Sequence, residues 1–488
     1  MLNINNSTAY LKREILVKIA KLQLNGELAQ GADRIPREIL PKGSDPFRCC
    51  LFHDREILRQ RVIARLGCSL EDYDEDKFLS EYVEESLTRK KPTSPILTVL
   101  DEACNACVKS QFMVTNACQA CIARPCMVNC GKKSISIKDG RAFIDSSTCV
   151  NCGLCLNNCP YHAIIKIPVP CEESCPVGAI EKNENGKERI DYEKCIFCGN
   201  CMRECPFGAM MDKGQLVDVI KHIMAGKKVV AIYAPAVAAQ FRVAPGQLEA
   251  ALLEAGFGKT WEVAIGADIT SDKEAKEFEE RMEHGEKIMT TSCCPAYVRA
   301  VNIHVPELIP CVSETHTPMH YTAELAKQDD PDCICVFIGP CLAKRREGMD
   351  DKYVDYVLSV EEIGAFFIAK EIEIGKSEAI VQSVIPTSSG RNFATTGGVA
   401  EAVRIRLQNP AKLKAAVING LDKAGMKQLA QYGKVQSGAL PCNDDTPNLV
   451  EVMTCEGGCI GGPSVITNIK VAGMQLKKYV ETGAAHPE

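Results

Sequence analysis

The sequence lacks an excess of positive charge, a long apolar run and a recognisable secretion signal, and each absence excludes a class of protein. Its 57 Lys and Arg against 63 Asp and Glu give a formal charge of −6, which offers no basic field for nucleic acid. No apolar run approaches the roughly 18 residues that a membrane span needs. The first residues contain neither a twin arginine nor a charged segment before an apolar core, so we expect a cytoplasmic protein.

Cysteine, by contrast, is abundant: the 488 residues include 28 Cys, but only 1 Trp and 8 His. Cytoplasmic proteins rarely use disulfides, so metal ligation is the better interpretation of so many thiols. Sixteen of them lie between Cys104 and Cys205, and nine lie after residue 290. Cys49 and Cys50 belong to neither group and have no C-x2-C partner nearby, so we expect them to be ordinary buried thiols.

The pattern of the chain changes twice, which predicts three regions. Residues 1–100 carry apolar side chains at helical spacing and should form a helical region. Residues 101–212 are short loops between cysteines, with too few large apolar side chains to fold without metal. Residues 213–488 alternate strands and helices, which predicts an α/β domain of mostly parallel sheets flanked by helices. We expect helices at 10–22, 55–66, 246–256, 271–284, 317–328 and 397–408, β-ribbons at 133–145 and 179–191, and buried strands at 229–234, 287–292, 334–339 and 415–420.

The cysteines between residues 101 and 212 have the spacing of ferredoxins that bind 4Fe–4S clusters. The runs at 149–160 and 195–206 read C-x2-C-x2-C-x3-C-P, and the run at 118–130 is a C-x2-C-x4-C-x3-C variant. In such a run the first three thiolates bind one cube and the fourth reaches a neighbouring cube, so sixteen thiols predict four accessory clusters. The alternative is paired zinc knuckles, because C-x2-C also suits zinc, but triple thiolate runs closed by Cys-Pro favour cubes. The predicted ligand groups are Cys118, Cys121, Cys126 and Cys159; Cys130, Cys149, Cys152 and Cys155; Cys175, Cys195, Cys198 and Cys201; and Cys104, Cys107, Cys171 and Cys205.

Three further cysteine motifs lie far apart in the C-terminal region. They read TTSCCPAYV, FIGPCLAKRRE and EVMTCEGGCIGGP. Two of them follow predicted strands, and active sites of α/β domains usually lie beyond the carboxyl ends of strands. One cysteine from each of the first two motifs and two from the third form another group of four.

These motifs resemble, in order, the three signature sequences of iron-only (FeFe) hydrogenases, TSCCPxW, MPCxxKxxE and ExMxCxxGCxxGG. The resemblance implies an H-cluster, which is a 4Fe–4S cube joined through one cysteine to a two-iron unit carrying CO, cyanide and a bridging azadithiolate. It implies that Lys344 pairs with a cyanide ligand and that Met453 packs beside the two-iron unit. The implied cube ligands are Cys294, Cys341, Cys455 and Cys459, with Cys459 as the bridge.

The same resemblance implies a route for protons. Cys293 falls on the proton-donating cysteine of the family, and the route continues through two glutamates, a serine and a surface arginine. These positions correspond to Glu274, Glu277, Ser313 and Arg281. Glu274, Glu277 and Arg281 are spaced to line one helix face, for which the alternative interpretation is an ordinary solvated charged face.

The sequence also departs from the signatures. Gly339 stands where the second motif has methionine, Tyr297 stands where the first has tryptophan, and Met319 stands where well-studied members often have glutamine. The third motif ends at Gly-Gly-Pro. These departures concern rate, catalytic bias and oxygen tolerance, and they leave the ligand set complete.

The sequence therefore predicts an iron-only hydrogenase that interconverts 2H⁺ + 2e⁻ with H₂. The expected partners are a soluble ferredoxin and the maturation proteins that build the two-iron unit, while the lack of a Gly-rich dinucleotide fingerprint speaks against NAD as a direct substrate. One alternative is a non-catalytic hydrogenase-like protein that serves in cluster assembly or sensing; Lys344, Cys293 and the lack of a sensor-type PAS segment argue against it. A pure electron-transfer subunit would not need the three C-terminal motifs.

Overall fold

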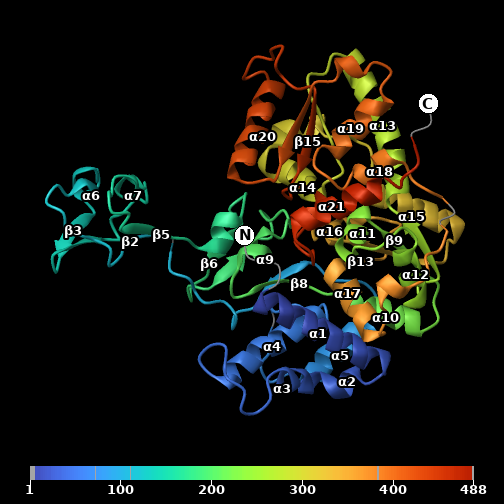
Figure 1. Cartoon of the computed structure of the whole chain (residues 1–488), viewed down its shortest axis with the longest axis horizontal. Helices are drawn as coiled ribbons and strands as arrows, with labels where there is room; N and C mark the ends of the chain where they lie inside the picture. The colour runs from blue at the N-terminus through green and yellow to red at the C-terminus, as the bar shows by residue number, and fades with distance from the viewer. Residues whose placement is uncertain (1–5, 72, 110, 382–383, 486–488) are drawn as a thin grey trace.

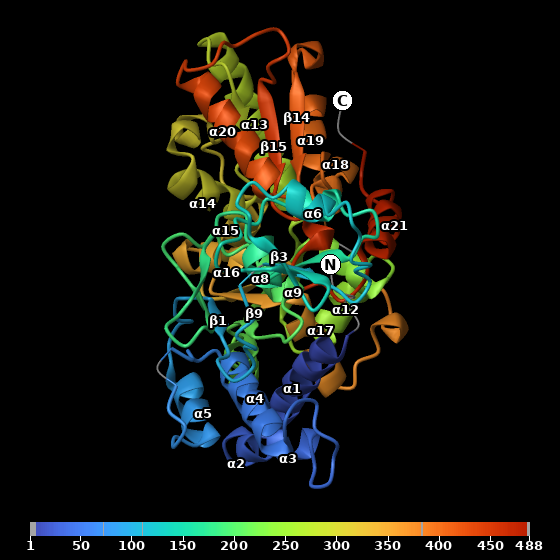
Figure 2. The same cartoon turned by 90° about the vertical axis from the view of Figure 1, so that its left-hand side faces the viewer.

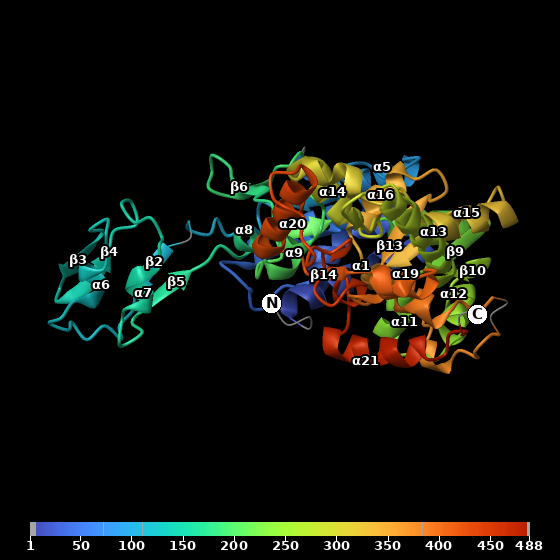
Figure 3. The same cartoon turned by 90° about the horizontal axis from the view of Figure 1, so that it is seen from above.

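The computed structural model describes residues 6–71, 73–109, 111–381 and 384–485. A helical N-terminal region lies at one end of a large body, and a small lobe formed by residues 111–167 projects from the side (Figures 1 and 3). Within the described residues, no helix is both long enough and apolar enough to span a membrane.

The N-terminal region is a group of helices around one apolar core (Figure 2). Its longest helix, α1 (Ser7–Leu24), begins where the Asn6 side chain accepts a hydrogen bond from the Ala9 N–H. α1 and α4 (Leu51–Arg65) contain the two helices that the sequence predicts here, so both predictions are confirmed. The remaining helical elements are α2 (Leu28–Gly31), η1 (Ala32–Arg34), α3 (Ile35–Ile39) and α5 (Leu79–Thr88).

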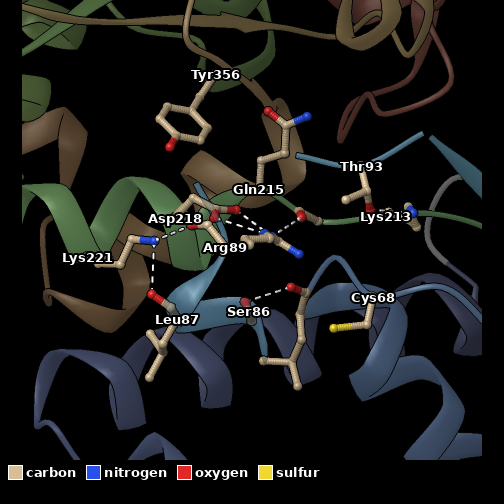
Figure 4. Close-up of polar contacts among 12 residues, drawn as sticks. Cys68, Ser86, Leu87, Arg89, Thr93, Lys213, Gln215, Asp218, Lys221 and Tyr356 are labelled. Atoms are coloured by element: carbon tan, nitrogen blue, oxygen red, sulfur yellow. Dashed lines mark hydrogen bonds and ion pairs between the residues drawn. The ribbon is translucent and has the colours of Figure 1, made fainter. Parts of the chain in front are cut away.

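Polar contacts fasten the end of α5 to α10 (Leu216–Met224), the first helix of the body (Figure 4). The Arg89 guanidinium donates to the fully buried Asp218 carboxylate, with Nε 3.0 Å from Oδ1. Lys221, one turn along α10, donates from Nζ to the main-chain oxygens of Leu87 and Arg89, each at 3.1 Å. Because breaking a buried ion pair leaves an uncompensated charge, these contacts hold the N-terminal region against the body.

Short strands and single helical turns make up the cysteine-rich segment. Both β-ribbons that the sequence predicts are present as antiparallel pairs, β3 with β4 in the lobe and β6 with β7 next to the body. A third antiparallel pair, β1 with β8, joins the end of the N-terminal region to the end of this segment. The elements are β1 (Leu97–Val99), β2 (Gln111–Val114), α6 (Pro125–Val128), β3 (Ile135–Lys138), β4 (Arg141–Ile144), α7 (Leu154–Asn157), β5 (Ile164–Ile167), α8 (Pro170–Ser174), β6 (Ile180–Lys182), β7 (Glu188–Ile190), α9 (Asn200–Glu204) and β8 (Met210–Asp212).

The body contains two parallel sheets flanked by helices, which confirms the predicted α/β class (Figure 1). The larger sheet has the order β10-β9-β12-β13 and the smaller one β11-β15-β14. Every residue of β9 is buried, as expected where helices cover both faces of a parallel sheet. The strands are β9 (Val229–Tyr233), β10 (Lys259–Glu262), β11 (Met289–Thr290), β12 (Ile334–Gly339), β13 (Tyr356–Ser359), β14 (Ala415–Asn419) and β15 (Leu449–Met453). The helices are α11 (Pro235–Phe241), α12 (Gln247–Glu254), α13 (Ala264–Glu283), α14 (Pro295–His304), η2 (Pro306–Cys311), α15 (Pro318–Asp329), α16 (Ala343–Asp350), α17 (Val360–Ala369), η3 (Ile374–Lys376), α18 (Ser388–Asn392), α19 (Gly398–Arg406), η4 (Pro410–Lys412), α20 (Lys423–Gln436), η5 (Cys459–Gly461) and α21 (Ile469–Val480).

One predicted strand is not buried as the sequence suggests. β14 lies at the edge of the smaller sheet and pairs only with β15, so the Val417 side chain is 41% exposed. Edge strands keep one side unpaired, and an apolar run cannot distinguish an edge position from a central one. β10, β13 and β15 are strands that the sequence pattern did not predict.

The prediction that Cys49 and Cys50 are buried thiols is wrong, because both are exposed. They lie in the loop that leads into α4, where Cys50 occupies the N-cap position. The Cys49 Sγ lies 3.0 Å from His53 Nδ1, so the loop directs this thiol toward the first turn of the helix rather than into a core. Adjacent residues in a loop lack the periodicity that would reveal their burial.

Candidate active site

The three C-terminal motifs meet because each follows a parallel strand. Cys293 comes after β11, Cys341 after β12 and Cys455 after β15, so the carboxyl ends of strands from both sheets deliver them to one place. There they line a cavity of about 100 Å³. All seven predicted residues of the cofactor pocket line this cavity, namely Cys293, Cys294, Cys341, Lys344, Met453, Cys455 and Cys459.

Local structure prepares the four predicted cube ligands for binding. Cys294 occupies the N-cap of α14, and its Sγ lies 3.2 Å from Thr454 Oγ1. Burial, followed by the charge of neighbouring thiols, raises the pKa of Cys341 to about 12 and that of Cys459 to about 11. Thiols in such surroundings lose their protons when a metal binds them. Four thiols around a small, mainly apolar cavity fit the cube of an H-cluster.

Lys344 supplies a buried positive charge at the same cavity. Its Nζ lies 2.6 Å from Glu347 Oε2 and donates to Thr317 Oγ1 at 3.0 Å. Burial opposes the charged form, but the Glu347 carboxylate outweighs it and raises the pKa of Lys344 above the ordinary value. The ammonium group therefore stays charged next to the cavity, where it suits an anionic cofactor.

Phe337 explains why the second motif can have glycine in place of methionine. Successive side chains of a strand point to opposite faces, so Phe337 and Gly339, two residues apart on β12, share one face. A Cβ at position 339 would lie 2.5 Å from the Phe337 ring, which itself lines the cavity. The phenyl ring thus occupies space that a longer side chain at 339 would need. Phe337 lies outside the three signature sequences, so their spacing does not identify it. The signal that could have found it is the glycine at position 339, because residues two places apart in a strand share a face.

Two further polar residues, Thr317 and Glu451, have roles that the motif spacing does not reveal. Thr317 accepts a hydrogen bond from Lys344 and donates one to Glu347, so it helps to orient the lysine. Glu451, the first residue of the third motif, is fully buried and accepts hydrogen bonds from the Gly397 and Ala400 N–H groups at 2.7 and 2.8 Å. It holds the start of α19 against β15, a structural role that spacing alone could not reveal.

The predicted proton route begins at Cys293 and Glu274. Glu274 lies on α13 and is fully buried, and its Oε1 accepts a hydrogen bond from the N–H of Ser292, the residue before Cys293, at 3.3 Å. Its Oε2 has no hydrogen-bond partner within the described residues. Burial first, and then the nearby charge of Glu277, raises the pKa of Glu274 to about 8. The alternative of a solvated helix face does not apply to this carboxyl group.

Glu277 continues the route one turn further along α13. It accepts hydrogen bonds from Ser313 Oγ at 2.6 Å and Thr315 Oγ1 at 2.9 Å, and its Oε1 lies 2.7 Å from Arg281 Nη2. Burial would raise the pKa of Glu277, but these donors together lower it. Arg281 is pinned by the Pro310 main-chain oxygen at 2.7 Å, so it is less free than a surface arginine.

An open groove of about 690 Å³ connects this route with solvent. Its lining includes Ser292, Ser313, Glu314 and Thr315, which surround the two glutamates, and Glu347 beside the lysine. The structure thus brings together the proposed donor, both glutamates, the serine and the arginine between the cysteine-lined cavity and the groove.

Several accessory cysteines lie near other members of their predicted group. Cys130, Cys149, Cys152 and Cys155 line a cavity of the lobe. Burial, and then the thiols of Cys198, Cys195 and Cys175, raises the pKa of Cys201.

The other two groups show the same kind of neighbours. Burial, and then the charges of Cys104 and Cys205, raise the pKa of the Cys107 thiol. Burial, and to a lesser extent the charges of Cys121 and Cys159, raise the pKa of the Cys126 thiol. Within the described residues, no three His, Cys, Asp or Glu side chains converge as ligands of one metal ion would. A cube needs its thiols further apart, at the corners of a cluster.

Comparisons with known proteins agree with this geometry. The family described as iron only hydrogenase large subunit, C-terminal domain, matches residues 227–463, and the 4Fe-4S binding domain family matches residues 142–165 and 188–211. Residues 227–463 therefore form a domain of the iron-only hydrogenase family. The chain is 27% identical to iron hydrogenase 1 of Clostridium pasteurianum, covering 44% of this chain and 45% of that protein. It is 26% identical to the periplasmic [Fe] hydrogenase large subunit of Nitratidesulfovibrio vulgaris, and the match covers 46% of this chain and 64% of that protein. The chain therefore spans 45% and 64% of the length of these relatives.

Two further similarities cover parts of the chain. A cytosolic Fe-S cluster assembly factor of Kluyveromyces lactis is 31% identical over 104 residues, which is 21% of this chain. The solved structure of the [FeFe]-hydrogenase HydA(deltaEFG) superposes with a TM-score of 0.43 at 23% identity, covering 51% of this chain and 84% of that one.

Proposed function

We propose that this chain catalyses the reversible conversion of 2H⁺ and 2e⁻ to H₂. The observation that carries the proposal is the single cavity lined by Cys293, Lys344 and four further thiols from three distant motifs. When bound, an H-cluster supplies the iron site at which electrons and protons combine. Cys294, Cys341, Cys455 and Cys459 would hold its cube, with Cys459 also bridging to the two-iron unit, and Met453 would pack beside that unit.

The protein's part in the reaction is to deliver protons to the cavity. The Cys293 thiol would release its proton into the cavity and regain one from Glu274, whose raised pKa of about 8 keeps it protonated near neutrality. Ser313 would pass a proton between Glu274 and Glu277, since its hydroxyl already contacts Glu277 at 2.6 Å. Glu277 would draw protons from the groove with Arg281 holding its carboxylate in place.

Electrons would reach the cavity through the accessory clusters. The chain contains a 4Fe-4S binding domain, and we propose four such clusters on the sixteen cysteines between Cys104 and Cys205. A soluble ferredoxin would exchange electrons with them, and separate maturation proteins would deliver the two-iron unit. We also propose that the protein acts in the cytoplasm.

A second candidate is a non-catalytic iron–sulfur protein, which the similarity to a cluster assembly factor favours. Lys344 and Cys293 count against it, because a protein without the two-iron unit needs neither a cation at the cavity nor a proton donor. The two candidates differ in whether the two-iron unit binds.

Infrared spectroscopy of the anaerobically matured protein distinguishes them. We expect absorption bands from metal-bound CO and cyanide, because only the two-iron unit carries these ligands. A Cys459→Ala variant provides the control, since it removes the bridging thiol and should lose the bands. Absence of the bands from the wild-type protein after maturation would contradict the hydrogenase and support the non-catalytic candidate.

A further inference from the structure

The N-terminal region packs against the end of the cysteine-rich segment through α4. This helix contacts β8, the last strand of the segment (Figure 1). Gly208, just before β8, has a φ of +59°, and a Cβ there would lie 3.2 Å from Arg61 Nη2 and would clash with Thr8. The glycine therefore leaves room for side chains of α1 and α4 next to the segment.

Arg61 brings a guanidinium group into this contact without an acidic partner. The residue is 4% exposed, and its Nη2 donates to the Phe207 main-chain oxygen at 3.0 Å. Within the described residues, its Nε and Nη1 have no hydrogen-bond partner. Arg65, one turn further along α4, is by contrast paired with Asp212 and Glu361. A buried cation is costly unless an opposite charge lies nearby.

The loop that Arg61 contacts begins at a predicted cluster ligand. The Cys205 Sγ accepts a hydrogen bond from the Ala209 N–H at 3.4 Å, so the loop turns back over the sulfur. Arg61 binds the oxygen of Phe207 in the middle of this loop. Burial lowers the pKa of Arg61 to about 10, and the nearby Cys205 opposes this shift. The guanidinium group therefore stays charged near neutrality beside this ligand.

Cys205 lies near the other thiols of its predicted ligand group. Its charge and that of Cys104 raise the pKa of Cys107, after the larger effect of burial. Burial raises the pKa of Cys171 to about 12, with smaller contributions from Cys205 and Cys107. We name these four thiols the Cys205 group: Cys104, Cys107, Cys171 and Cys205.

The acidic side chains beside the Cys205 group already have a cation of their own. Glu188, whose N–H donates to Cys104 Sγ at 3.4 Å, is paired with Lys182. The Lys182 Nζ also lies 3.6 Å from Glu172 Oε1. This pairing leaves an anionic cluster on the four thiols as the charge that would compensate Arg61.

A second arginine of the N-terminal region contacts the loop at the other end of the group. Arg48 Nη1 donates to the main-chain oxygens of residues 102 and 103, at 3.1 and 3.0 Å, just before Cys104. Its guanidinium carbon lies 5.3 Å from the centre of the Phe207 ring. Because Arg48 is only half-buried, solvent screens its charge more than that of Arg61.

We propose that the N-terminal region raises the reduction potential of a 4Fe–4S cluster on the Cys205 group through the buried charge of Arg61. A cube with four thiolate ligands is anionic, and its reduction adds one electron without forming or breaking a bond. A fixed cation stabilises the reduced form more than the oxidised form, because the reduced form carries more negative charge. In the protein, the electron comes from the redox partner. This inference rests on the proposed function, because it assumes a cluster on these thiols.

A redox titration of the full chain, followed by electron paramagnetic resonance, tests this proposal. The clusters are reconstituted from iron and sulfide without the two-iron unit, and dithionite supplies the electrons. The signal that Cys104→Ala alters identifies the cluster of the Cys205 group. For this cluster, Arg61→Gln should lower the ratio of reduced to oxidised form at least about tenfold at a given potential. That change corresponds to a midpoint lower by about 59 mV for one electron.

Two variants separate the charge of Arg61 from its packing. Arg61→Lys keeps a cation and should stay within about threefold of the wild-type ratio. Arg37→Gln removes the same charge from an exposed position on α3 and should stay within about twofold. Iron content, measured for every variant, should equal that of the wild type.

Three results would overturn the proposal while the cluster is present in the wild type. They are an unchanged ratio in Arg61→Gln, an equal change in Arg37→Gln or Arg61→Lys, and loss of the cluster from Arg61→Gln. The last result would show that Arg61 holds the ligand loop rather than sets the potential. If Cys104→Ala altered no signal, the four-cluster assignment of the proposed function would fail as well. The iron content and this signal therefore distinguish the two failures, and neither measurement uses H₂.

Discussion

Cys293 and Cys294 are neighbours in the chain, yet the structure gives them different surroundings. Cys294 caps α14 and contacts Thr454, as suits a cluster ligand. Burial is the main reason that the pKa of the Cys293 thiol is raised, and the charge of the nearby Glu274 is the second. A thiol beside a buried carboxyl group, which can return a proton to it, is placed for proton transfer.

Replacing Cys293 therefore tests this division of roles. Cys293→Ala should leave the clusters in place and lower H₂ evolution by at least about a hundredfold, because a methyl group cannot transfer a proton. Infrared spectra and gas chromatography measure the two effects. Cys294→Ala is the matched control, which should damage the cube and weaken the infrared bands. Equal loss of the bands in both variants would contradict the assignment.

Glu274 should leave a signature in the pH dependence of stability. Its pKa is raised from an ordinary value near 4.5 to about 8, so the folded protein retains this proton where the unfolded chain has lost it. The contribution is complete below pH 4.5 and is lost as the pH rises toward 8, at up to about 1.4 kcal/mol per pH unit. Denaturant unfolding of wild type and Glu274→Gln across this range measures the difference. In the variant this part of the slope should vanish and H₂ evolution should collapse; an unchanged slope together with normal turnover would refute the route.

At the scale of elements, β12 and α13 each carry their functional residues through their own periodicity. The alternation of β12 places Phe337 and Gly339 on one face, and the helical repeat of α13 places Glu274, Glu277 and Arg281 on another. The burial of each face, however, comes from other elements, since α13 packs against α15 and α19.

The Phe337 and Gly339 pair can be tested by exchanging the bulk between the two positions. Gly339→Met should destabilise the protein by about 1–3 kcal/mol through overpacking, and Phe337→Ala by about 3–5 kcal/mol through a cavity. The double variant should be more stable than the sum of both changes predicts, because each substitution relieves the other. Thermal unfolding of the four proteins measures this coupling. Strictly additive effects would show that the ring and position 339 do not compete for space.

At the scale of the whole molecule, iron content tests the assignment of all cysteine groups together. Four accessory cubes and one H-cluster require about 22 iron atoms per chain. Elemental analysis of the matured protein should therefore find this amount with little zinc. About 10 iron atoms together with bound zinc would instead support zinc knuckles in part of the cysteine-rich segment.

The amino-acid sequence alone predicts the features that depend on the spacing of residues close together in the chain. C-x2-C runs predict cluster ligands because neighbouring thiols must reach one small object, and the apolar periodicity predicts α1, α4 and the alternating α/β body. The three motifs likewise contain the cysteines, Lys344 and Met453 that line the cavity. The grouping of thiols from different runs required an additional rule, namely that the fourth thiolate of a run binds the neighbouring cube.

The packing of segments far apart in the chain determines which of these residues are buried and which groups they contact. Glu274 and Arg281 belong to one charged helix, yet neighbouring elements bury the first completely and pin the second against the Pro310 oxygen. Phe337 and Thr317 gained their roles in the same way. The physical reason is that burial, and with it the pKa of a carboxyl group, depends on packing partners that lie far away in the chain.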